Sequence, residues 1–233
     1  MKCIWEHNGN DTLLYSADYI GAYTRGATLA VALQKMQREL RCYALWRGQE
    51  PPQDADLTIV QERSTSLHIA DADSDVLFDT ETTPLSPEEY VELKALALQS
   101  ALDFLALYDS IPNKNESCRP ERSTFYGRVP RTAQEMYAHT KNVNAYYFGE
   151  IGIEADNEGT IYDCRARGFA RLEEQKDFLR VPVTEGSYGE LWSLRKVLRR
   201  FIWHDRIHAK AMYRMAVQTF GASAVENPFR FLL

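Results

Sequence analysis

Three of the five histidines in this 233-residue chain have the spacing of metal ligands. His204 and His208 are four residues apart, so on a helix both imidazoles lie on one face, where a single ion can take a nitrogen from each. They also continue an apolar stripe that steps by three or four residues: Leu194, Val197, Phe201, Met212 and Met215. Because buried imidazoles need partners to offset their lost hydration, this pair predicts a divalent metal site.

His139 lies on the inward face of another predicted helix, together with Met136, Val143 and Tyr146. Three imidazoles that leave one coordination position open suit Zn(II), Ni(II) or Fe(II). The alternative is three separate core histidines, each hydrogen-bonded to a carbonyl or a carboxylate. The other two, His7 and His68, show no ligand spacing and are interpreted as ordinary polar residues.

The charged neighbours of these histidines do not identify a general base. Glu135 lies one turn before His139 and is either its hydrogen-bond partner or a helix-capping residue, and the spacing favours the cap. Asp205 is about 100° round the helix from His204 and is expected to face elsewhere. Four arginines on the same helix indicate either an anion-attracting surface or, the favoured interpretation, a solvated face: Arg195, Arg199, Arg200 and Arg206.

Four capping patterns predict the helices that position the histidines. Each pattern has Ser or Thr followed three residues later by an acid, and they begin at Ser86, Thr132, Thr160 and Ser187. The predicted helices end near residues 111, 148, 175 and 220. The connection over residues 113–131 is long and is expected to cross the end of a bundle. This half is therefore predicted to be an all-α four-helix bundle.

The first 80 residues are typical of an α+β fold, a small sheet with one helix. Residues 2–6 and 12–16 flank an Asn-Gly-Asn turn and predict a hairpin. Thr28 is the predicted N-cap of a helix over residues 29–46. Three further short strands are expected, at residues 57–60, 67–69 and 76–78.

Two prolines break regular structure between these halves, and the predicted domains are residues 1–80 and 86–233. The net charge of −6 makes nucleic acid a poor candidate partner. No apolar run is long enough for a membrane span, so no membrane partner is expected. Four cysteines lie far apart without a CxxC motif, which is typical of thiols in a reducing cytoplasm.

The segment from Ala133 to His139, with the aromatic residues 146–148, resembles the second helix of the DinB/YfiT-like family. The segment from Arg195 to Met215 resembles that family's HxxxH helix. This resemblance covers about residues 85–220 and implies a bundle in which His139, His204 and His208 hold a divalent metal. Some members of that family resemble thiol S-transferases or isomerases that use bacillithiol or mycothiol.

The first half resembles the HicB-like fold, through residues 19–21, residues 26–29 and the helix that follows. It departs from that pattern at Ile20-Gly21, where Pro-Gly is usual, and at Val31-Ala32, where Glu-Ala is usual. The resemblance implies a module that binds a protein partner or a ligand, and no DNA-binding segment accompanies it.

The leading hypothesis is a metal-dependent enzyme, a thiol S-transferase or a hydrolase, whose substrate is a small molecule such as a low-molecular-weight thiol. The metal would lower the pKa of bound water or of the substrate thiol. The alternative is a non-enzymatic binding or regulatory protein whose metal site is structural or vestigial. A third hypothesis is a dimerising scaffold, with Trp192, Trp203, Phe229 and Phe231 at a homodimer interface, although packing in the core explains these aromatic residues as well.

Overall fold

A computed structural model describes residues 1–232 of the chain. Residue 233, the last residue of the predicted second domain, lies outside the described residues. Two compact units are present: residues 1–82 and 229–232 form the first unit, and residues 83–228 form the second. No helix within the described part of the chain is long and apolar enough to cross a membrane.

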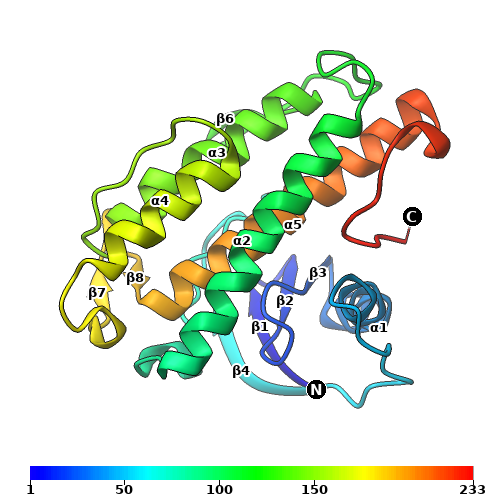
Figure 1. Cartoon of the computed structure of the whole chain (residues 1–233). Helices are drawn as coiled ribbons and strands as arrows, with labels where there is room; N and C mark the ends of the chain where they lie inside the picture. Colours follow the sequence, from blue (N-terminus) through cyan, green and yellow to red (C-terminus); the bar gives the residue numbers. More distant parts are fainter. Residues whose placement is uncertain (233) are drawn as a thin grey trace. The chain divides into compact units, whose positions relative to one another are not determined.

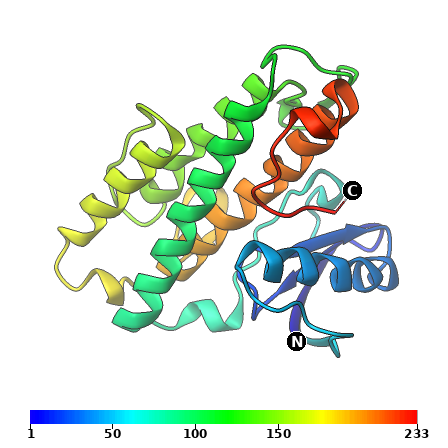
Figure 2. The ribbon, with the colours of Figure 1, turned by 45° about the vertical axis from the view of Figure 1, so that its right-hand side comes forward.

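The first unit is a mixed four-stranded sheet with one helix packed on it (Figure 2). The strand order is β3-β2-β1-β4, and only the β1–β4 pair is parallel. Such a parallel pair needs a crossover connection, and the helix provides it. The elements are β1 (Lys2–His7), β2 (Thr12–Ser16), β3 (Tyr23–Gly26), α1 (Leu29–Trp46) and β4 (Thr58–Ser64).

Apolar side chains spaced by four residues on α1 form the core of this unit. Ala32, Met36 and Leu40 are buried against Cys3 and Leu14 of the sheet. The predicted hairpin and the predicted helix are therefore confirmed, and the hydroxyl of Thr28 caps the helix by accepting from the Val31 N–H.

Two of the predicted strands are wrong. Residues 67–69 run into a 3-10 helix, and residues 76–78 form no strand. This segment is held by a side chain instead of a strand ladder. The buried Glu6 carboxylate accepts hydrogen bonds from Ser74 Oγ at 2.6 Å and from the Asp75 N–H at 3.2 Å. Strand β3, in contrast, forms over residues for which no strand was predicted.

Four long helices dominate the second unit and run side by side (Figure 1). Helices α2 and α3 each pack against α4 and α5, so α4 and α5 lie diagonally opposite. Three of the predicted capping boxes are present at the starts of these helices. The bounds are α2 (Pro87–Ser110), α3 (Ala133–Gly149), α4 (Ile161–Glu173) and α5 (Leu194–Phe220).

The fourth predicted cap, at Ser187, is wrong. Helix α5 begins at Leu194, and Ser193 caps it by accepting from the Lys196 N–H at 3.1 Å. Tyr188 and Gly189 have φ values of 62° and 71°, which a right-handed α-helix does not tolerate. Short 3-10 helices occur here and elsewhere, at Ile69–Asp71, Asp79–Thr82, Phe178–Arg180, Ser187–Gly189 and Ala222–Ala224.

The predicted layout, a small α+β domain followed by an all-α four-helix bundle, is also wrong. The described residues form a mixed four-stranded sheet and five α-helices, and two small sheets interrupt the helical half. The chain also returns to the first unit at its end, where the ring of Phe229 lies 5.3 Å from that of Trp46. The small sheets pair β5 (Ser123–Thr124) with β6 (Gly127–Arg128) and β7 (Thr184–Glu185) with β8 (Leu191–Trp192).

The physical reason for this correction is the length of the segments involved. Two-residue strands and a short aromatic tail have no helical or strand period to detect. Phe229 and Phe231 in the tail are nevertheless buried, and burial of large aromatic side chains is favourable enough to direct a short segment.

Candidate metal centre

The structure brings His139 of α3 together with His204 and His208 of α5. The centroids of the His204 and His208 rings are 4.5 Å apart, and those of His139 and His208 are 4.6 Å apart. The His139 and His204 centroids are 5.2 Å apart. One ligand nitrogen from each ring lies within 4.8 Å of the other two. We call these three residues the histidine cluster.

The upper limit of 4.8 Å on the nitrogen–nitrogen distances is larger than the separation in an occupied tetrahedral site. Metal–nitrogen bonds of about 2.0–2.1 Å place tetrahedral ligand nitrogens about 3.3 Å apart. Binding of an ion would therefore draw the rings together by about 1.5 Å at most.

The local sequence explains why His139 faces α5. Thr132 accepts from the Glu135 N–H at 3.1 Å, and the Glu135 carboxylate accepts in return from the Thr132 and Arg131 N–H groups. This reciprocal cap fixes the start of α3 and the rotation of its first turns. These hydrogen bonds also lower the pKa of Glu135 below its usual range. Of the two roles considered for Glu135, the structure shows the cap.

His204 is the most deeply placed member of the cluster, with only 9% of its surface exposed. Its Nδ1 is buried and has no hydrogen-bond partner among the described residues. Burial, with a further contribution from His208 and His139, lowers the pKa of His204 well below its ordinary value. Burial also lowers the pKa of His139. His139 and His204 therefore favour the neutral imidazole, the form that binds metal ions.

The donor set fits a divalent metal ion with an open coordination position. No carboxylate or thiolate of the described residues joins the three histidines. His139 and His208 are only half-buried, whereas His204 is buried. The side of the cluster formed by His139 and His208 is therefore less enclosed than the side formed by His204. Three histidine ligands with a free fourth position are typical of catalytic zinc sites, whereas structural sites have four protein ligands.

Tyr147 forms an aromatic wall beside the cluster. Its ring packs edge-on to His204, with 6.0 Å between ring centroids, and also against Phe201 and Trp192. Burial raises the pKa of its hydroxyl. Tyr147 packs beside the His204 ring, with Phe201 and Trp192 as its aromatic neighbours.

Three of the four arginines that the sequence assigned to a solvated face of α5 are not on one, which corrects the favoured interpretation. Arg199, Arg200 and Arg206 are buried. Arg200 lies 3.4 Å from the Glu190 carboxylate, and its guanidinium stacks over aromatic rings. Arg195 lies nearer the surface, where it binds Glu89 and the carbonyls of residues 83 and 84.

Sequence reasoning missed a buried ion pair next to His204. Arg165 of α4 donates two hydrogen bonds to Asp205, and both side chains are almost fully buried. The sequence did contain an indication of this pair, because Arg165 falls on the apolar stripe of its helix and a buried arginine needs an acidic partner. That stripe contains Ile161, Cys164, Gly168, Phe169 and Leu172.

The remaining histidines lie in the first unit and outside this cluster. His7 stacks on Trp5, with 4.1 Å between ring centroids, and its Nε2 lies 3.1 Å from Glu62 Oε1. His68 precedes a 3-10 helix, and its backbone N–H donates to Asp73.

Comparison of the chain with protein-family models, with curated proteins and with solved structures finds no match. The DinB-like and HicB-like resemblances therefore remain predictions.

Proposed function

We propose that His139, His204 and His208 bind one divalent metal ion, and that the protein is a metal-dependent enzyme of the transferase or hydrolase type. The observation that supports this most strongly is the buried Nδ1 of His204, which has no hydrogen-bond partner among the described residues. An unpartnered polar atom in a protein interior is costly, and an ion bound to this cluster through Nδ1 of His204 would remove the cost.

Zn(II), Ni(II) and Fe(II) suit an all-imidazole donor set. Such an ion supplies Lewis-acid chemistry, lowering the pKa of a bound water or thiol. The protein contributes the three imidazoles and the less enclosed side next to His139 and His208. The Tyr147 ring packs edge-on to His204 and is itself packed against Phe201, which supports the position of the His204 ring.

A low-molecular-weight thiol is the proposed substrate, and S-transfer the first reaction to test. In such a transfer the thiol sulfur forms a bond to an electrophilic carbon of the acceptor. The leaving group departs with the bonding electron pair, and the thiol proton passes to solvent. The resemblance to thiol-using DinB-like proteins motivates this choice.

The proposed compartment is the cytoplasm. All four cysteines, at positions 3, 42, 118 and 164, are free thiols, and free thiols are typical of reducing compartments.

The first test is elemental analysis of purified protein. Wild type, His204→Ala and His7→Ala are compared, the last as a matched control from outside the cluster. We expect about one divalent ion per chain in wild type and in the control, and much less in His204→Ala. Unchanged metal content in His204→Ala would exclude the site.

The second test separates an enzyme from a binding or regulatory protein. Wild type is assayed for transfer of thiols to a chromogenic electrophile before and after chelation, with circular dichroism as the check on folding. If chelation abolishes the activity while the circular dichroism spectrum is unchanged, the result supports a metal-dependent enzyme. Stoichiometric metal without any metal-dependent activity supports the regulatory alternative, in which the ion is structural.

A further inference from the structure

Helix α5 is buried on all sides along the stretch that carries His204. Every residue from Lys196 to Arg206 is buried. A surface helix is oriented by the contrast between its apolar and its solvated face. This stretch has no solvated face, so the partners of its buried charged residues also contribute to its rotation about the helix axis.

The ion pair between Arg165 and Asp205 supplies a contact that does select a rotation. The Arg165 guanidinium donates from both terminal nitrogens to the two Asp205 oxygens, one of these bonds measuring 3.0 Å. The same group donates to the Ala97 carbonyl of α2 at 3.1 Å. Bidentate arginine–carboxylate pairs have a narrow geometry, so this contact permits little rotation of α5.

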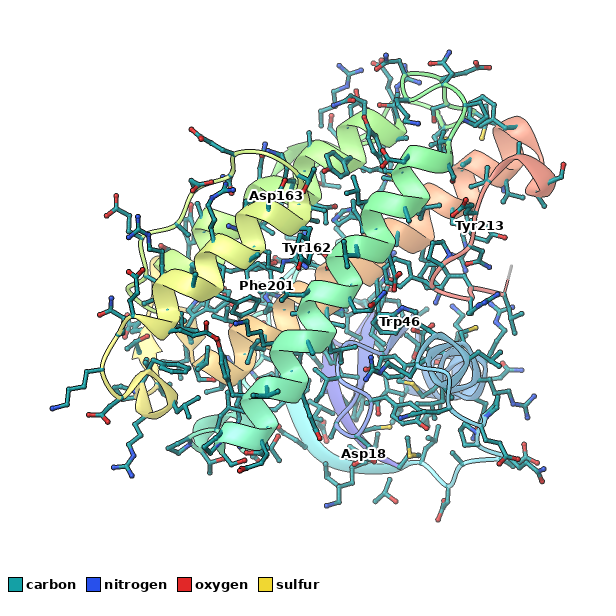
Figure 3. All side chains as sticks on the ribbon, in the orientation of Figure 1. Asp18, Trp46, Tyr162, Asp163, Phe201 and Tyr213 are labelled. Carbon is teal, nitrogen blue, oxygen red and sulfur yellow. The ribbon has the colours of Figure 1, made fainter. Side chains whose placement is uncertain are left out.

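The pair crosses the interior of the second unit between the diagonal helices α4 and α5. Phe201, labelled in Figure 3, is fully buried on α5, and the guanidinium carbon of Arg165 lies 4.4 Å from its ring centroid. The aromatic ring thus supports the guanidinium one turn before Asp205. A backbone carbonyl of α2 and side chains of α4 and α5 meet at this point.

We infer that Arg165 and Asp205 are positioning residues for the histidine cluster: their ion pair fixes the rotation of α5 so that His204 faces His139. This inference rests on the proposed function. Consecutive helical residues are about 100° apart, so an Asp205 held toward α4 directs His204 to a different side of α5. Helix α3, which carries His139, packs on α5.

The energetics of buried ion pairs favour a positioning role over a stabilising one. Removing both charges from water costs about as much as their attraction returns, and apolar replacements of a whole pair are often as stable as the original. What an apolar pair lacks is a directional contact. Replacing both residues with apolar ones should therefore leave the stability of the fold nearly unchanged while removing the contact that orients the histidine cluster.

Helix α4 offers a matched control two residues away. Arg167 also pairs with an aspartate, Asp156, through two contacts. Both of these side chains are about half exposed, and the partner lies in the connection between α3 and α4 and not on α5. Loss of this pair should leave the rotation of α5 unchanged.

The test measures Co(II) binding by its visible absorption, with cobalt as the probe ion. The variants are Arg165→Met with Asp205→Leu, Arg165→Lys alone, and the control Arg167→Met. Thermal unfolding in chelator reports the fold without metal. We expect the double variant to unfold near the wild-type temperature, to bind Co(II) at least tenfold more weakly, and to show an altered spectrum.

Wild-type affinity and spectrum in a folded double variant would overturn the inference. If the double variant does not fold, the Arg165→Lys variant tests the inference, because lysine keeps the positive charge but cannot form the bidentate contact with Asp205. Weakened Co(II) binding in this variant supports the inference, and wild-type binding overturns it. A wild-type protein that binds no Co(II) would instead contradict the proposed metal site itself.

Discussion

His7 in the first unit and His204 in the second differ in what surrounds their nitrogens. The His7 ring is stacked on Trp5, and its Nε2 contacts the Glu62 carboxylate at 3.1 Å. His204 is more deeply buried, and its Nδ1 has no hydrogen-bond partner among the described residues. The ring of His204 instead lies beside two further imidazoles.

The His7 ring thus has a hydrogen-bond partner within the protein. The buried Nδ1 of His204 has none among the described residues, which favours a bound ligand at this position. Most buried polar groups in proteins are hydrogen-bonded, so an exception requires an explanation. Two buried charges near His204 have charged partners, since Arg165 contacts Asp205 and Lys196 contacts Glu190. The predictions below either change a charged group that has a partner in the protein or add a divalent metal ion as a partner for His204.

The largest effect is expected when a satisfied buried group loses its partner. Arg165→Met leaves the Asp205 carboxylate buried without its cation. We expect the free energy of unfolding to fall by about 3–5 kcal/mol, measured by denaturant titration. A variant as stable as wild type would show that Asp205 has access to water.

Lys196 provides a pH-dependent test. Its ammonium is held by Glu190 and by the Leu191 carbonyl, and burial lowers its pKa from 10.5 to about 8. The folded state therefore releases this proton before the unfolded state does. Between about pH 8 and pH 10.5, the stability of wild type should rise relative to Lys196→Met, by up to about 3 kcal/mol.

Denaturant titrations of both proteins across this pH range measure the difference, since groups common to the two proteins cancel. A difference that stays constant from pH 7 to pH 10.5 would mean that Lys196 has an ordinary pKa in the folded protein.

Supplying a partner to His204 should stabilise the protein. A divalent ion at 100 times its dissociation constant adds about 2.7 kcal/mol to the free energy of unfolding. Thermal scans with Zn(II) and with chelator measure this gain, which should vanish in His204→Ala and persist in His7→Ala. Equal gains in all three proteins would assign the stabilisation to another site.

The smallest effect is expected at His7. Its contact with Glu62 is partly exposed to solvent, and exposed ion pairs contribute little to stability. We expect His7→Gln to change the free energy of unfolding by no more than about 1 kcal/mol, with metal content unchanged. A larger loss of stability, or any loss of bound metal, would contradict the proposed difference between His7 and His204.

The helices that carry the histidine cluster were predictable from local signals. The capping box at Thr132 and the apolar steps through Phe201 place each histidine on an inward helical face. Helical phase is a local property, so one sequence suffices to predict it. Whether the three imidazoles bind a metal ion remains a prediction.

Other features depend on contacts between distant residues and could not be predicted in this way. The hydrogen bonds from Ser74 to Glu6 span 68 positions, and those from Arg165 to Asp205 span 40. Neither pair has a periodic signature. The start of α5 was misplaced for a different reason, because the Ser187 pattern has the residue types of a cap but not the backbone conformation.

The most direct test of the metal site is a crystal structure of the full chain, grown with Zn(II) and measured at the zinc absorption edge. We predict one strong anomalous peak, about 2.0–2.1 Å from a nitrogen of each of His139, His204 and His208, with the fourth position held by a non-protein ligand. Absence of a peak among the three histidines at saturating zinc would contradict the proposed site. A fourth side chain bound to the ion would contradict its open position.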